Sequence, residues 1–309
     1  MTYTHQPVLL HEVIEGLAIQ PNGIYIDATF GRGGHSHTIL QRLGPEGKLL
    51  ALDKDLTAVE RGKIRPFEDP RFCIVHGSFT QLRQTVQDRD WCGKVNGILL
   101  DLGVSSPQLD DPERGFSFIK DGPLDMRMNQ QTGMDATTWI NHATIAEIAY
   151  VLRTYGEERF AKRIAHAIVN ARENQPVTRT KQLSDIIATA IPTREIKKHP
   201  ATRSFQAIRI FINHELEELQ ECLQQSLEVL AIGGRLCVIS FHSLDDRIVK
   251  QFIQRESRTA AYPRGLPIRE KHMQYRLRKL GSLIRASEKE ISDNPRARSA
   301  RLRIAEKLS

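Results

Sequence analysis

Three short apolar runs in the first third of the chain end in an aspartate: Asp27, Asp53 and Asp101. Each run has the length and composition of a buried strand. Open parallel sheets bind ligands beyond the carboxyl ends of their strands, where an acid typically accepts hydrogen bonds from two ribose hydroxyls. Asp53 is the candidate for that role. The pattern therefore predicts a nucleoside-like ligand at one edge of a parallel sheet.

A glycine-rich turn follows the first run, with Gly31, Gly33 and Gly34 directly ahead of an amphipathic helix. Glycine tolerates positive φ and has no Cβ to hold a ligand away from the backbone. The helix N-terminus adds free N–H groups and positive potential. Strand, glycine turn and helix in this order form the floor of a nucleotide or adenosyl site, although a tight turn alone would also explain the glycines.

The signs of the charges distinguish two cofactors. A dinucleotide fingerprint reads G-x-G-x-x-G, but Thr29 occupies the place of its first glycine. Asp27, two residues earlier, would repel a pyrophosphate and suits a cationic ligand. S-adenosylmethionine carries a sulfonium and an ammonium and no phosphate, so the pattern favours it over NAD.

The run ending at Asp101 continues into Ser105-Ser-Pro-Gln108. Enzymes that methylate exocyclic amines carry Asn, Asp or Ser here, followed by Pro-Pro and an aromatic residue. The polar side chain and a nearby carbonyl accept hydrogen bonds from the amine. Ser105 stands in the polar place, whereas Ser106 and Gln108 replace the first proline and the aromatic residue. A Ser-Pro turn without catalytic meaning is the alternative.

Two ring side chains follow other predicted strands. Phe79 stands at the exit of the third strand, where it could lie against an adenine ring or pack in the core. His242, after a later strand, could accept a proton or contact a base, or it could be a structural residue.

Strands and helical patterns alternate up to Pro107, which predicts an α/β fold with a doubly wound, mostly parallel sheet. Helical periodicity then covers 145–155, 159–172 and 180–189, before a long helical pattern over 202–230 and a strand over 235–240 resume the α/β rhythm. The tail alternates like strands over 275–291 and 298–308. We therefore expect a first part of the α/β domain over 1–105, an inserted helical substrate-binding domain over 106–200, and a second part with a basic tail over 201–309.

Composition indicates an ordinary globular protein of 309 residues with net charge +7 and pI near 9.3. Residues 255–309 hold 15 Lys and Arg against 6 Asp and Glu. This basic end suits a polyanionic partner, or it is simply a solvated face. The four cysteines are scattered, which argues against a disulfide framework or zinc knuckle, so no metal is expected. With no signal-like or membrane-length apolar run, we expect a cytoplasmic protein without membrane contact.

Eight motifs extend from the start of the chain almost to its end. They occupy residues 5–10, 27–36, 101–110, 114–118, 122–128, 199–209, 240–250 and 294–300. Together they resemble one family, the bacterial small-subunit ribosomal RNA (cytosine-N4) methyltransferases, and in combination they are highly specific.

The resemblance implies a class I S-adenosylmethionine-dependent methyltransferase, Rossmann-like, with a helical insert that binds substrate. It implies methylation of N4 of one cytidine in the decoding centre of 16S ribosomal RNA, within the small ribosomal subunit. By motif match, the residues expected to contact the cofactor are Gly33, Gly34, His35, Asp53, Phe79, Asp101 and Gln108.

Methyl transfer to N4 requires acceptors for the amine hydrogens, because its lone pair is delocalised into the ring. Ser105, the backbone near Pro107, and the carboxylates Asp101 or Asp125 are the catalytic candidates. Alignment and electrostatics should supply most of the rate. The target base must be unstacked. Phe116, Phe118 and Arg127 are candidates to stack on it or hold it, together with His242, although loop packing would also explain the phenylalanines.

Three other functions remain open. A DNA amino-methyltransferase would normally carry the Pro-Pro-aromatic form of the motif. A non-catalytic RNA-binding or assembly factor would leave the acids at the strand ends unexplained. An NAD oxidoreductase is disfavoured by Thr29 and Asp27. The sequence allows a monomer or a homodimer.

Overall fold

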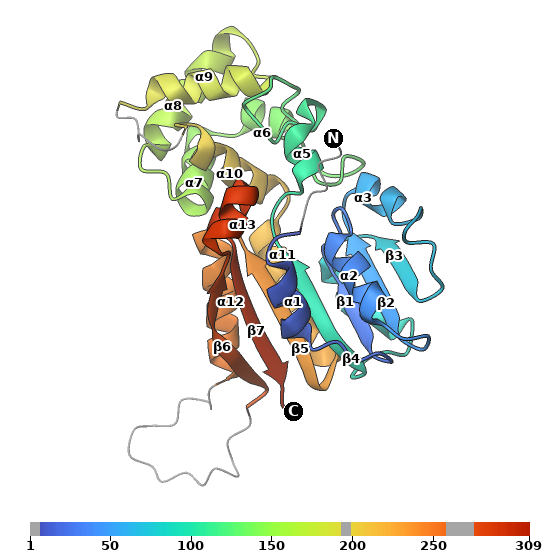
Figure 1. Ribbon diagram of the computed structural model, residues 1–309. Coiled ribbons are helices and arrows are strands. Elements are labelled where there is room, and N and C mark those ends of the chain that lie inside the picture. Colours follow the sequence, from blue (N-terminus) through green and yellow to red (C-terminus); the bar gives the residue numbers. More distant parts are fainter. Residues whose placement is uncertain (1–6, 193–198, 258–274) are drawn as a thin grey trace, which may run out of the picture. The chain divides into compact units, whose positions relative to one another are not determined.

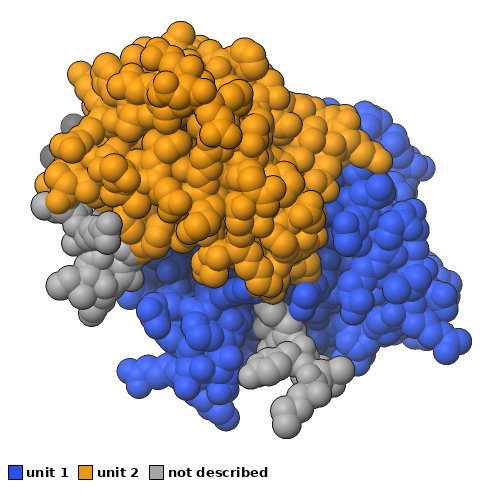
Figure 2. Space-filling view, turned by 90° about the horizontal axis from the view of Figure 1, so that it is seen from above, with its two compact units in different colours: residues 1–103, 216–309 blue, residues 104–215 orange. Residues whose placement is uncertain are grey.

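The computed structural model describes residues 7–192, 199–257 and 275–309. Residues 5 and 6 of the first motif lie outside these ranges. The chain divides into two compact units, drawn in blue and orange in Figure 2. Unit 1 comprises Met1–Gly103 and Leu216–Ser309, and unit 2 comprises Val104–Glu215.

A seven-stranded sheet forms the centre of unit 1, with the strand order β3-β2-β1-β4-β5-β7-β6 (Figure 1). The strands from β3 to β5 pair in parallel, whereas β7 runs antiparallel to both β5 and β6. The predicted doubly wound, mostly parallel α/β sheet is thereby confirmed. The strands are β1 (Ile24–Asp27), β2 (Lys48–Asp53), β3 (Phe72–His76), β4 (Val95–Asp101), β5 (Leu230–Ser240), β6 (Leu277–Arg285) and β7 (Arg301–Lys307).

Apolar side chains leave both faces of this sheet because successive strand residues point in opposite directions. In β2, Leu50 and Leu52 join a core cluster with α11 and α12, while Leu49 joins another with α1 and α2. The sheet is therefore covered by helices on both faces, as expected for parallel strands. The helices of unit 1 are α1 (Leu10–Leu17), α2 (Gly34–Arg42), α3 (Leu56–Arg61), α4 (Leu82–Gln87), α11 (Glu215–Val229), α12 (Ser243–Glu256) and α13 (Glu288–Asp293), with the 3-10 turns η1 (Phe79–Gln81) and η4 (Pro295–Ser299).

Unit 2 is helical and has its own core, in which Trp139, Ile148, Ile164 and Leu183 are buried. Three of the predicted helices correspond to α7, α8 and α9. The elements are α5 (Ser106–Asp110), η2 (Pro112–Arg114), α6 (Ala136–His142), α7 (Ile145–Gly156), α8 (Ala161–Asn174), α9 (Thr180–Ala190) and α10 (Thr202–Ile212).

The compact unit is longer than the expected insert over 106–200. Helix α10 packs against α7, so unit 2 continues through Glu215. Whether the two units act as the expected catalytic and substrate-binding domains remains a prediction.

Two local expectations were wrong. The helix expected over 202–230 is interrupted at His214, whose φ of 53° leaves the helical region. Strand character was expected up to residue 291, but the Ser287 side chain accepts the Glu290 N–H and starts α13.

None of the helices in the described ranges combines the length and apolarity needed to span a membrane.

Candidate active site

Asp27 ends β1 and organises the turn that follows. Its side chain is buried, and its carboxyl oxygens accept the Ser36 hydroxyl at 2.7 Å and the Thr29 N–H at 3.2 Å. Burial raises the pKa of Asp27 to about 6, although the bonds from Ser36 and Thr29 oppose that rise. The carboxyl group of Asp27 therefore ties the end of β1 to the first turn of α2.

Close packing is by itself a sufficient reason for glycine at both Gly33 and Gly34, at the start of α2. Gly33 has a φ of 74°, and a Cβ there would lie 2.3 Å from Cζ of Phe67. A Cβ on Gly34 would lie 2.3 Å from Cγ of Pro7. Real carbon atoms never approach this closely, so any side chain would displace these neighbours. The glycine turn thus has a structural reason in addition to the cofactor role that the sequence predicts.

Asp53 ends β2, the strand beside β1. Its carboxyl oxygens accept the N–H groups of Gly31 at 2.7 Å and Asp55 at 2.8 Å. Burial raises its pKa to about 6. A carboxylate oxygen has two lone pairs, so each oxygen can accept one further bond, as a ribose would require.

Asp101 ends β4, on the other side of β1, and its backbone N–H donates to Oγ1 of Thr29 at 2.6 Å. The side chain of Asp101 is 26% exposed. Its Oδ1 is nevertheless buried and has no hydrogen-bond partner within the described ranges. Its Oδ2 lies 3.7 Å from Nδ1 of His35.

The contact between His35 and Asp101 is not an ion pair at neutral pH. Burial lowers the pKa of His35 to about 4, so the ring is neutral. Its Nε2 lies 3.0 Å from the carbonyl oxygen of Val8, which can only accept, so Nε2 carries the hydrogen. An acceptor, Nδ1, therefore faces Asp101. Burial, with a smaller contribution from Asp27, raises the pKa of Asp101 to about 8. The site thus holds a protonated acid that a cationic ligand would ionise.

Phe79 and His242 are both partly buried in unit 1. Phe79 begins η1 and packs against the main core cluster. His242 precedes α12, and its Nε2 lies 2.9 Å from Oδ2 of Asp245, with the two side chains 10% and 4% exposed. The imidazole ring therefore lies against a buried carboxyl group.

Ser105 and Gln108 belong to the cap of α5 in unit 2. The Ser105 N–H donates to Oε1 of Gln108 at 2.8 Å, and Gln108 is 4% exposed. Both residues therefore contribute to the start of a short helix. Their catalytic and cofactor-binding roles remain predictions.

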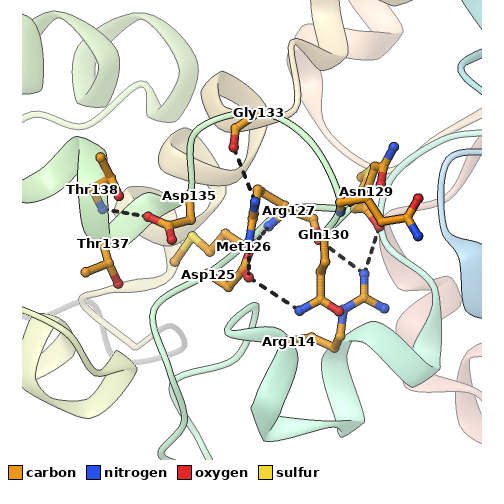
Figure 3. A network of polar contacts seen from close by, with 12 residues as sticks. Arg114, Asp125, Met126, Arg127, Asn129, Gln130, Gly133, Asp135, Thr137 and Thr138 are labelled. Atoms are coloured by element: carbon orange, nitrogen blue, oxygen red, sulfur yellow. Dashed lines mark hydrogen bonds and ion pairs between the residues drawn. The ribbon is translucent and has the colours of Figure 1, made fainter.

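Asp125 and Arg127 form a two-bonded ion pair in unit 2 (Figure 3). Nε of Arg127 lies 2.8 Å from Oδ1 of Asp125, and Nη2 lies 2.9 Å from Oδ2. Burial opposes ionisation of Asp125, but the hydrogen bonds from Arg127 outweigh it and hold its pKa below the usual range. Such a carboxylate is a weak proton acceptor. The geometry favours a role in orienting Arg127.

The two phenylalanines of unit 2 differ in their surroundings. Phe116 is 6% exposed and belongs to the helical core. Phe118 stacks on His199 with ring centroids 4.5 Å apart, and Phe205 meets its edge. Phe116 therefore has the environment of a packing residue, while Phe118 lies in an aromatic group that a base could join.

The sequence did not identify four polar residues that hold these loops. Thr29 accepts a hydrogen bond from the backbone N–H of Asp101, and Ser36 donates one to the carboxyl group of Asp27. Arg114, 7% exposed, donates to the carbonyl oxygens of Arg127 and Met128. Asn213 accepts the Met128 N–H at 2.7 Å. Of these, Thr29, Ser36 and Arg114 had a usable signal, because they lie within the motifs at residues 27–36 and 114–118.

The structure brings the predicted cofactor residues Gly33, Gly34, His35, Asp53, Phe79 and Asp101 into unit 1, where β1, β2 and β4 are adjacent. Of the remaining candidates, His242 also lies in unit 1. The others, Ser105, Gln108, Phe116, Phe118, Asp125 and Arg127, lie in unit 2. Among the described residues, no group of three or more His, Cys, Asp and Glu side chains could hold a metal ion.

Comparison with known proteins is informative over almost the whole chain. The model of a family described as the MraW methylase family matches residues 2–308. Ribosomal RNA small subunit methyltransferase H from Coxiella burnetii (strain RSA 331 / Henzerling II) is 68% identical over 305 residues, which cover 99% of each chain. The protein of the same name from the Nine Mile strain matches equally well. Among solved structures, an rRNA methylase from Streptococcus thermophilus aligns over 100% of both chains with 12% identity and a TM-score of 0.44, values too low to add to the assignment.

Proposed function

The chain belongs to the MraW methylase family, and we propose that it methylates the exocyclic N4 of one cytidine in the decoding centre of 16S ribosomal RNA. It is an S-adenosylmethionine-dependent methyltransferase with the class I, Rossmann-like fold. The RNA substrate is supported by the relative that is 68% identical over 99% of both chains. The observation in the structure that carries the proposal is the buried Oδ1 of Asp101, which has no hydrogen-bond partner among the described residues.

The residues of unit 1 suit S-adenosylmethionine in their chemistry. Asp101 would accept hydrogen bonds from the ammonium group of the cofactor, and Asp53 would accept them from its ribose hydroxyls. Phe79 would lie against its adenine ring. When bound, the cofactor supplies a methyl group on a sulfonium, which is already an activated leaving group. The neutral ring of His35 adds no positive charge beside that sulfonium.

The protein residues then have to hold the cytosine amine in one orientation. Ser105 and the backbone near Pro107 would accept its N–H hydrogens, as would a carboxylate from Asp101 or Asp125. Arg127 already donates hydrogen bonds to both carboxyl oxygens of Asp125, so Ser105 is the better candidate to accept the amine hydrogens. Phe118 is the better candidate to stack on the unstacked base, because Phe116 is core.

The same proposal implies a partner and a cellular location for the enzyme. The substrate is 16S ribosomal RNA, which we place within the small ribosomal subunit and therefore in the cytoplasm. The enzyme acts as a monomer or a homodimer, which sedimentation with and without RNA would decide.

Labelled S-adenosylmethionine incubated with small subunits, or with free ribosomal RNA lacking the modification, tests the function. We expect label on N4 of a single cytidine, and loss of turnover in Ser105→Ala with cofactor affinity retained. Label on duplex DNA would indicate the DNA amino-methyltransferase instead. Absence of cofactor binding would favour a non-catalytic RNA-binding factor.

A further inference from the structure

One stripe of α11 forms hydrogen bonds with the two loops that carry the proposed adenosine contacts (helix labelled in Figure 1). One carboxyl oxygen of Glu218 accepts a hydrogen bond from Nζ of Lys54 at 2.7 Å. The other accepts a hydrogen bond from the Ser78 hydroxyl, also at 2.7 Å. Lys54 directly follows Asp53, and Ser78 directly precedes Phe79. A single carboxylate thus bridges the exits of β2 and β3.

A second side chain on the same stripe holds the other end of the β3 exit. The amide of Gln225 donates to the carbonyl oxygen of Thr80 at 2.6 Å and accepts the Arg83 N–H at 2.8 Å. The Ser78 hydroxyl also accepts the Thr80 N–H at 3.1 Å. Phe79 therefore lies between two anchors, both from α11.

The buried apolar side chains of α11 fix the position of these anchors. Leu219, Cys222 and Leu223 are buried in the main core of unit 1. Glu218 and Lys54 are only 18% and 20% exposed, so their ion pair is shielded from solvent. Partly desolvated charged hydrogen bonds are stronger and more directional than exposed ones. A rigid helix with directional bonds is suited to setting the geometry of a binding loop.

We propose that Glu218 is a positioning residue for the adenosine half of the cofactor, with Gln225 as its support. This rests on the proposed function. Glu218 acts through Lys54 and Ser78, which hold Asp53 and Phe79 in the arrangement that receives ribose and adenine. It does not touch the reacting atoms, so its effect falls on cofactor binding and not on the chemical step.

The test compares Glu218→Ala with Glu228→Ala, which also removes one acidic charge from the same helix. Glu228 pairs with Arg83 at the surface, where both side chains are more than half exposed. Affinities for S-adenosylhomocysteine and for 5′-methylthioadenosine, which lacks the amino acid part, are measured by calorimetry, with KM and kcat for RNA methylation. Wild-type protein that binds neither ligand would reject the proposed function before any variant is judged.

For Glu218→Ala we expect about tenfold weaker binding of both ligands, a similar rise in the cofactor KM and an unchanged kcat. Glu218→Gln, which can retain the Ser78 bond, should recover part of the affinity. Glu228→Ala should stay within about twofold of wild type. A Glu218→Ala protein that melts earlier but binds both ligands normally would overturn the proposal. A loss confined to S-adenosylhomocysteine would also overturn it, because the adenosine half would then be unaffected.

Discussion

We expect Asp101 to couple cofactor binding to proton release. Its pKa is about 8 in the cofactor-free protein, so most molecules carry the proton at pH 7. An ammonium group favours the carboxylate, and binding must therefore expel that proton. We expect release of nearly one proton for each S-adenosylmethionine bound at pH 7, measured by calorimetry in buffers of different ionisation enthalpy.

The Asp101→Asn variant isolates this effect. It should bind S-adenosylmethionine about 10- to 100-fold more weakly and release almost no proton, because the charged acceptor is gone. Binding of 5′-methylthioadenosine should be nearly unchanged, since that ligand has no ammonium. Equal losses for both ligands would contradict the assignment of Asp101 to the ammonium group.

The same carboxyl group makes stability depend on pH. The folded-state pKa of Asp101 is raised above its ordinary value of 3.8, so the folded protein binds more protons than the unfolded chain between these two pH values. The free energy of unfolding of the cofactor-free protein should therefore fall as pH rises from about 4 to 8. Denaturant titrations should show a shallower decline in Asp101→Asn. An equal decline in both proteins would assign the effect to Asp27 and Asp53, whose pKa values are also raised.

Gly33→Ala should lower the free energy of unfolding by about 2 to 4 kcal/mol, because strain from positive φ adds to the collision with Phe67. Gly93→Ala is the matched control, since Gly93 has a φ of 71° but no atom within 4 Å of an added Cβ. Its cost should be about 1 to 2 kcal/mol. Equal costs in the two variants would remove the packing reason for Gly33.

At the scale of elements, Asn213 joins the end of α10 to the loop that bears Asp125 and Arg127. It is 5% exposed, accepts the Met128 N–H at 2.7 Å and donates to the Met126 carbonyl oxygen at 2.8 Å. Met126 has a φ of 63°, a conformation that a methionine adopts only when its neighbours impose it.

Asn213→Ala should lower the free energy of unfolding by about 2 to 3 kcal/mol, because two backbone groups of the loop lose their partners. It should also weaken RNA binding while leaving cofactor affinity unchanged. Asn174→Ala, on an exposed helix end with one 3.3 Å bond, should have little effect on either property. If Asn174→Ala weakened RNA binding equally, the loss in Asn213→Ala could not be assigned to the loop that bears Asp125 and Arg127.

At the scale of the whole molecule, the basic end of the chain is partly neutralised by its own fold. Arg301 and Arg303 pair with Asp246, Arg276 pairs with Glu256, and Arg278 pairs with Glu306. Arg285 is exposed and has no ion pair in the part of the chain that is described. The tail therefore offers fewer free cations to a phosphate backbone than its composition indicates.

Arg285→Ala should weaken RNA binding and reduce the slope of log affinity against log salt by about one, as expected when one phosphate contact is lost. Arg303→Ala should instead reduce stability, since Arg303 is 12% exposed and binds both oxygens of Asp246. Binding measured from low to physiological salt separates these cases. An unchanged slope in Arg285→Ala would place the RNA elsewhere.

The sequence by itself determined the parallel strands that end at Asp27, Asp53 and Asp101, together with the glycine turn. These features depend on local apolar periodicity and on residue types with narrow backbone preferences. It also determined the family, since the chain contains eight motifs that resemble those of the family. Helices α7, α8 and α9 of unit 2 were predicted for the same reason: their buried residues repeat every three or four positions.

Only the tertiary structure decided what the polar groups do. The pKa of Asp101 depends on burial beside His35 and Asp27, and Asp125 is held by Arg127. The boundary of unit 2 depends on α10 packing against α7, and the break at His214 accompanies the bonds of Asn213 to a distant loop. Such contacts join residues far apart in the chain, and no local pattern encodes them.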